Sequence, residues 1–317
     1  RGRLQKVIAA FRRELLLERP EPERCGKGPG RAIALHKLFK IKDYFTTFIL
    51  DRNAYYLDKN ILEPLTKPHL LSYAEIAGPA QVDWFVSHFW GDPFEHLCAS
   101  LRKHAEAIVG RERWGQLAYW ICFVSNNQYK IPEEMGSSWS ESSFFLTLQS
   151  GLCKGVCMVL DDAALPLTRA WCIFELLQTL KLEQRSDFGG LMLCTSSGIL
   201  NSGSGSVDVA MNLVRKIVAL DLEHASASSE NDKAMISAQV KSELGSFGAM
   251  NLFVREKMHD ILTRARGSTN SMFDSLFETL DEGLESARKI RDSVPAPAAV
   301  SGSWAKRPAR RIWRERL

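Results

Sequence analysis

The sequence lacks the short motifs that identify several common classes of enzyme. It contains no P-loop, no HExxH and no CxxC, and no dinucleotide-binding GxGxxG follows its first predicted strand. These absences remove support for ATP-binding, zinc-hydrolase and nicotinamide-redox functions. Long apolar runs are missing as well, because the longest, such as 119–124 and 155–160, are far shorter than the roughly 20 residues of a membrane-spanning helix. We therefore expect no transmembrane segment.

Cysteine is present, but not in a pattern that suits a disulfide framework. The chain of 317 residues has seven cysteines, an odd number, spread over predicted strands and helices. Free thiols in a reducing compartment explain this usage best, so we expect a cytoplasmic protein. The hydrophobic content of 45% suits one large globular domain or two small ones. Because the chain begins with Arg1, we expect a fragment or a processed form.

Zinc is not expected at the clustered histidines and cysteines of the sequence. His96 and His104 are eight residues apart on one predicted helix, about two turns, with Cys98 between them. This spacing does not build a tetrahedral site. Cys153 and Cys157 are interpreted as small buried apolar residues at a helix-to-strand junction. The sequence therefore predicts no metal site.

Charge is distributed unevenly along the chain. Residues 1–40 hold 11 Lys and Arg against 4 Glu, and residues 304–317 hold 6 against 1, so the part between them is acidic although the net charge is +4. We expect the basic end, 291–317, to be a disordered tail. The alternative is that Trp304, Trp313 and the neighbouring cations contact nucleic acid or an anionic membrane surface.

Short apolar runs alternate with helical patterns in the middle of the chain. Strands are predicted at 82–87, 118–125, 155–161, 189–196 and 217–222, and helices lie between them. This order predicts an α/β domain over 80–222 with a parallel sheet covered on both faces, and ligands at the carboxyl ends of its strands. A helical extension and linker (1–79) precedes the domain, and helices (223–290) that pack on it follow.

Polar residues follow the predicted strands and should meet at one rim of the sheet. The first strand leads into Ser87, His88, Phe89, Trp90 and Asp92, the second into 125–128 and the third into 161–162. The segment TRAWCIFELL (168–177) comes next, and in a helix its Trp171 and Glu175 share one face. Glu175 is therefore either a surface charge of an amphipathic helix or an acid facing a pocket at this rim.

The segments FVSHFWGD and TRAWCIFEL resemble two conserved boxes of TIR (Toll/interleukin-1 receptor) domains. The pairing of an SHxWG box with an RxWCxxEL box is similar to divergent TIR-like domains of protists. The resemblance covers about 80–222 and implies a flavodoxin-like sheet of five parallel strands. In enzymatic members the acid of the second box acts in cleavage of the nicotinamide–ribose bond of NAD+, which places that role on Glu175. The expected nucleotide-binding residues are Ser87, His88, Phe89, Trp90, Asp92 and Trp171.

Two functions follow from this resemblance. The first is an NAD+ glycohydrolase, in which NAD+ is a substrate and no cofactor is needed. A carboxylate near the ribose stabilises the positive charge that develops as the bond breaks, and burial should raise its pKa. The second is a module that associates with itself or with other TIR-like domains and has no turnover.

Overall fold

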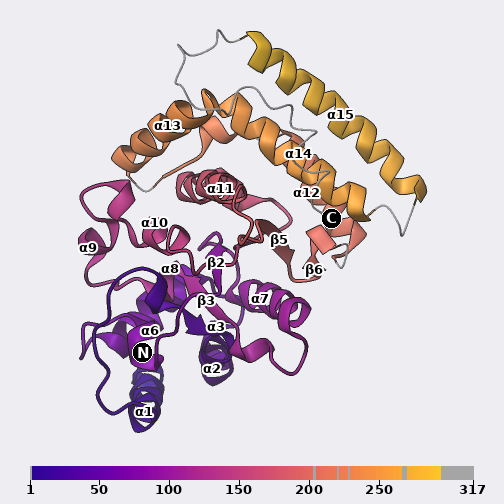
Figure 1. Ribbon diagram of the computed structural model, residues 1–317. Helices are drawn as coiled ribbons and strands as arrows, with labels where there is room; N and C mark the ends of the chain where they lie inside the picture. Colours follow the sequence, from indigo (N-terminus) through magenta and orange to yellow (C-terminus); the bar gives the residue numbers. More distant parts are fainter. Residues whose placement is uncertain (1, 203–204, 220, 228, 266–269, 294–317) are drawn as a thin grey trace.

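The protein is an α/β structure built around one mixed sheet. The computed structural model describes residues 2–202, 205–219, 221–227, 229–265 and 270–293. Figure 1 shows the sheet between two groups of helices, with the N-terminal helices on one side and the C-terminal helices on the other. The expected α/β class is therefore confirmed.

The helices are α1 (Gly2–Glu18), α2 (Leu35–Tyr44), α7 (Phe94–Val109), α10 (Ser143–Leu148), α11 (Ala170–Leu182), α12 (Val207–Ala219), α13 (Glu230–Leu244), α14 (Phe247–Ala265) and α15 (Asn270–Ser293). Single helical turns are α3 (Thr46–Ile49), α4 (Ala54–Leu57), α5 (Glu63–Thr66), α6 (Tyr73–Ala77), α8 (Cys122–Ser125) and α9 (Ile131–Met135), with a π-helical turn at Asp58–Leu62. The strands are β1 (Ile33–Ala34), β2 (Trp84–Ser87), β3 (Ala118–Ile121), β4 (Val156–Val159), β5 (Leu191–Thr195) and β6 (Gly198–Ile199).

The sheet has the order β1-β3-β2-β4-β5-β6. The four inner strands β3, β2, β4 and β5 are parallel, and the two short edge strands are antiparallel to their neighbours. Four of the five predicted parallel strands are thus confirmed, with shorter bounds. The sequence pattern missed β1 and β6 because each spans only two residues.

The fifth predicted strand, 217–222, is wrong. Residues 217–219 continue α12, and Leu222 lies in a 3-10 turn. The buried residues of this helix recur at helical spacing, so the apolar end of the run belongs to the same stripe as Leu213 and Val214. The mostly apolar residues 217–222 resemble a strand only when they are taken without the helical pattern of the preceding residues of α12.

Each face of the sheet covers its own hydrophobic core, because successive side chains of a strand point to opposite faces. Phe85, Trp120 and Met158 pack on the side of α10, α11, α13 and α14. Val86 and Ile121 pack on the other side, with α1, α2 and α7. The strands are therefore buried on both faces, as parallel strands usually are.

The N-terminal extension is part of this second core. On α1 the side chains of Ile8, Phe11 and Leu15 are buried at helical spacing, so the helix packs on the domain rather than serving as a linker. Arg31 ties the extension to the domain, because its guanidinium pairs with Glu134 at 2.5 Å and with Glu75 at 3.4 Å. All three side chains are almost fully buried.

The C-terminal helices cover the opposite face. Val240 of α13 and Met258 of α14 belong to the core around α11, and α15 lies along the outer side of α14 (Figure 1). The basic tail, including Trp304 and Trp313, lies outside the described residues. Within the part of the chain that is described, no helix combines the length and the apolarity required to cross a membrane.

Candidate functional site

The expected rim lies where β2 and β4 end. The chain passes from β2 to its neighbour β3 and then crosses over to β4 on the other side of β2. In such a sheet the loops after the two strands run in opposite directions and leave a crevice at their carboxyl ends, the usual ligand position in open α/β sheets. Ser87, the last residue of β2, borders this position.

Glu175 lies inside the protein at this rim. It is the sixth residue of α11, and only 4% of its surface is exposed. The alternative in which Glu175 is a surface charge is therefore wrong. Burial raises the pKa of Glu175 to about 8, and Ser87 is the polar neighbour that lowers it. The Ser87 contact is loosely aligned, because neither Ser87 Oγ nor Glu175 Oε2 makes a hydrogen bond of standard geometry.

Further buried polar groups surround this carboxyl on α11. Cys172 and Gln178 lie one turn before and one turn after Glu175, on the same side of the helix. Both polar atoms of the buried Gln178 side chain also lack a hydrogen-bond partner. Gln178 was not among the predicted site residues, because one Gln in an apolar helix resembles a surface position.

His88 contributes a neutral imidazole to the rim. Burial lowers the pKa of His88 to about 4, so the ring carries no charge at neutral pH. Its Nε2 lies 3.6 Å from Cys122 Sγ, and its ring packs edge-on against Phe123 at 5.5 Å. Trp90 Nε1 donates to the same sulfur at 2.9 Å. His88, Trp90 and Cys122 thus form one cluster, and the sequence analysis missed Cys122 because it lies within an apolar run.

Asp92, after β2, lies close enough to Asp161, after β4, for the two carboxyl groups to interact. It is buried, its Oδ2 has no hydrogen-bond partner, and its pKa is raised to about 7, mainly by burial and further by Asp161. Asp161 accepts from the backbone N–H of Leu165 at 2.7 Å. The predicted meeting of the first and third strand ends is therefore observed.

Trp171 and Phe89 have other partners. The Trp171 ring stacks on Phe144 at 5.2 Å, and its indole N–H donates to Asp232 on α13 at 3.1 Å. The indole N–H of Trp171 therefore contacts the C-terminal helices. The half-buried Phe89 ring lies under the guanidinium of Arg169, 5.7 Å from it.

A segment of the N-terminal extension lies on the loop that follows β2. Ala54 N–H donates to Trp90 O at 3.0 Å, and Phe94 N–H donates to Arg52 O at 2.8 Å. The ring of Tyr55 lies 5.3 Å from that of Trp90. We call residues 52–58 the cover segment. Its last residue is Asp58, whose pKa is raised to about 7, mainly by burial.

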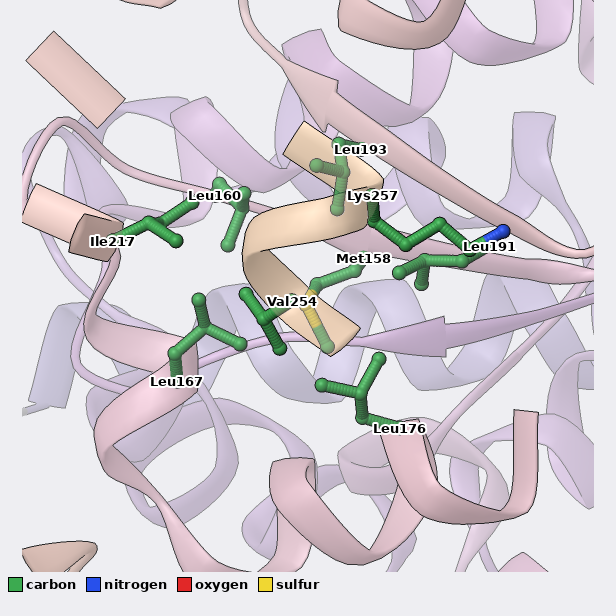
Figure 2. A pocket seen from close by; sticks show the side chains of 9 residues that line it. All are labelled: Met158, Leu160, Leu167, Leu176, Leu191, Leu193, Ile217, Val254 and Lys257. Carbon is green, nitrogen blue, oxygen red and sulfur yellow. The ribbon is translucent and has the colours of Figure 1, made fainter. Parts of the chain in front are cut away.

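The pocket in Figure 2 is not part of this site. It lies between the sheet and α14, and its volume is about 10 Å³. Its lining is apolar apart from Lys257, whose ammonium pairs with Glu183 at 2.7 Å. An apolar space of this size holds one water molecule at most and is too small for a ligand.

Comparison of the chain with protein-family models, with curated proteins and with solved structures gives no match.

Proposed function

We propose that this chain is a TIR-like domain that cleaves the nicotinamide–ribose bond of NAD+ with Glu175 as the reacting carboxylate. The observation that carries the proposal is the buried Glu175 carboxyl, with an unpaired oxygen, beside Ser87 at the end of the central strand. Buried polar groups without partners are rare in folded proteins, and strongly shifted pKa values cluster at functional sites.

The arrangement of the parallel strands supports the TIR-like assignment. Taken in chain order, they lie second-first-third-fourth in the sheet, which is the order of the first four strands of a flavodoxin-like fold. The fifth parallel strand of that fold has no counterpart here among the described residues, where α12 occupies the corresponding sequence.

The raised pKa suits a substrate that is itself positively charged. In the absence of ligand Glu175 keeps its proton at neutral pH, because burial disfavours the charge. The nicotinamide ring of NAD+ carries a positive charge, which favours the carboxylate and drives the proton out. When the ribose–nitrogen bond breaks, its electron pair leaves with nicotinamide, and the carboxylate stabilises the cationic ribose. Water then adds to that carbon and loses a proton, so that the products are nicotinamide, ADP-ribose and H+.

We infer that access to Glu175 requires movement of the cover segment, because this segment lies on the loop that follows β2. Its contacts to Trp90 and Phe94 are two backbone hydrogen bonds and one ring contact, and an opening must also withdraw the buried side chains of Ala54 and Leu57 from the core. Such an opening separates the extension from the loop after β2 and admits the nucleotide. The domain is therefore closed at rest and active when opened.

Nicotinamide release from NAD+ tests this function. Wild type is compared with Glu175→Gln and with Glu243→Gln, a control on α13 whose carboxylate pairs with Lys181 near the end of α11. Protein concentration and crowding agents are varied to promote assembly. The proposal is supported if wild type and the control release nicotinamide and Glu175→Gln does not. It is rejected if wild type releases no nicotinamide under any condition.

The closed state favours a second candidate, a TIR-like interaction module without turnover. A glutamate of which only 4% is exposed can be a folding feature alone. This candidate predicts concentration-dependent self-association, measured by light scattering after size exclusion, that is the same for wild type and Glu175→Gln and occurs without nicotinamide release.

A further inference from the structure

Three soft or borderline metal ligands meet inside the protein, away from the acidic rim. His104 on α7, Cys157 on β4 and Cys194 on β5 place their ligand atoms within 4.8 Å of one another. The two sulfurs are 3.1 Å apart. All three side chains are fully buried, and all three come from different elements of the same core.

The imidazole of His104 is oriented for coordination. Its Nδ1 lies 2.6 Å from the hydroxyl oxygen of Tyr119, and that hydroxyl donates to Leu101 O at 3.5 Å. The contact to Nδ1 is much the shorter of the two, and either of its atoms can be the donor. When Nδ1–H donates to the Tyr119 oxygen, Nε2, which has no hydrogen-bond partner in the protein, presents a lone pair to an ion. Metal-binding histidines are commonly fixed by such a contact at the second nitrogen.

A disulfide between the two cysteines fits the backbone less well. Cys157 lies opposite Met192 in the β4–β5 register, and Cys194 lies two residues further along β5. Strand spacing then separates the Cα atoms by about 8 Å, beyond the roughly 7 Å limit for a disulfide. An ion about 2.3 Å from each sulfur holds the sulfurs roughly 3.8 Å apart, which the present arrangement reaches by a small rotation of the side chains.

We propose that His104 Nε2, Cys157 Sγ and Cys194 Sγ bind a thiophilic metal ion, Zn2+ or Cu+, in the core between α7 and the sheet. Met192, the register partner of Cys157 on β5, packs against the same core. Sulfur and imidazole ligands are those that Zn2+ and Cu+ prefer.

Charge balance favours Zn2+ in this dry environment. Binding replaces the two thiol protons with the ion and releases both to solvent, so a neutral pair of thiols becomes a neutral Zn2+–dithiolate centre. With Cu+ the centre carries one negative charge, which costs more to bury. Because the ligands are inaccessible in the folded chain, the ion enters during folding.

The test is metal content after refolding under reducing conditions with Zn2+ or with Cu+, followed by gel filtration and elemental analysis. We expect one ion per wild-type chain, none in Cys157→Ala or Cys194→Ala, and one in Cys98→Ala, a matched control at another buried cysteine. Circular dichroism confirms that each variant is folded. Tyr119→Phe keeps the ligands but removes the contact to Nδ1, and it should weaken binding about 10- to 100-fold.

The result that overturns the proposal is a folded wild-type protein that retains neither ion. If Cys98→Ala and Cys194→Ala retain the same amount of metal, the ion is bound elsewhere, and this result also rejects the site. Two results together would show that the pair serves a redox role instead. Mass spectrometry would find a Cys157–Cys194 disulfide in protein purified without reductant, and the reduced protein would bind neither ion.

Discussion

The rings of Tyr55 and Trp90 lie 5.3 Å apart, one on the N-terminal extension and the other on the loop after the central strand. This contact joins a helical turn that precedes the domain to the loop that borders Glu175. It holds the extension against that loop, and a single substitution at Tyr55 can loosen it.

Tyr55→Ala should loosen the cover segment. An aromatic pair contributes about 0.5–1.5 kcal/mol, so its loss shifts the opening equilibrium by roughly 2- to 10-fold. We expect hydrogen exchange in a peptide spanning 88–94 to accelerate by that factor, and nicotinamide release to rise with it. Leu17→Ala, at an exposed position of α1, is the control. Unchanged exchange in Tyr55→Ala would show that the contact does not hold the loop.

Glu175→Gln should change how stability depends on pH. The carboxyl has a pKa of about 8 in the folded protein and about 4.5 when unfolded, so between these values only the unfolded chain loses its proton. Wild type therefore loses about 1.4 kcal/mol of unfolding free energy per pH unit as pH rises through this window, and nothing below it.

The Gln side chain cannot ionise, so the variant lacks this slope. His88, Asp58 and Asp92 titrate in both proteins, and their effects cancel in the difference between wild type and variant. Urea unfolding at pH 5.5 and pH 7.5 should show the variant gaining roughly 3 kcal/mol relative to wild type. A difference that does not depend on pH would mean that Glu175 is solvated.

Arg31→Ala should destabilise the whole domain. It removes the cation from two buried carboxylates, Glu75 and Glu134, and breaking a buried pair costs about 3–5 kcal/mol. Arg24→Ala breaks an exposed pair with Glu133 and should cost less than about 1 kcal/mol. Equal losses, measured by urea unfolding, would show that the extension does not fold together with the domain.

Trp171→Phe should affect stability but not catalysis. The substitution keeps an aromatic ring against Phe144 and removes the hydrogen bond to Asp232, which costs about 1.5–3 kcal/mol when the acceptor is charged. We expect KM and kcat for NAD+ to stay within about twofold of wild type. A large rise in KM would place the indole against the substrate, as the TIR resemblance implies.

The four central strands and the rim could be predicted from the sequence because parallel strands are continuous apolar runs that end in polar residues. The fifth strand could not, because an apolar run at the end of an amphipathic helix looks like a short strand. The polar residues around Glu175 were only partly predictable. Ser87 ends a strand and was identified, whereas Cys122 and Gln178 occupy apolar segments and become visible only in the structure.

The metal ligands escaped detection for a related reason. Spacing within one helix excludes zinc at His96, Cys98 and His104, but the sheet brings His104 to Cys157 and Cys194 from other elements. Cys157 lies 53 positions after His104 in the sequence, and Cys194 lies 90 positions after it. Contacts over such separations leave no local sequence pattern.

The most direct test of the central claim is the protonation state of Glu175 with and without a stable NAD+ analogue. Carbocyclic NAD+ keeps the nicotinamide charge but cannot be cleaved. In difference infrared spectra at pH 7, wild type should show a protonated-carboxyl band that is absent from Glu175→Gln and that disappears when the analogue binds. A band that persists at saturating analogue, or that is equal in the variant, would contradict the role of Glu175 as the reacting carboxylate.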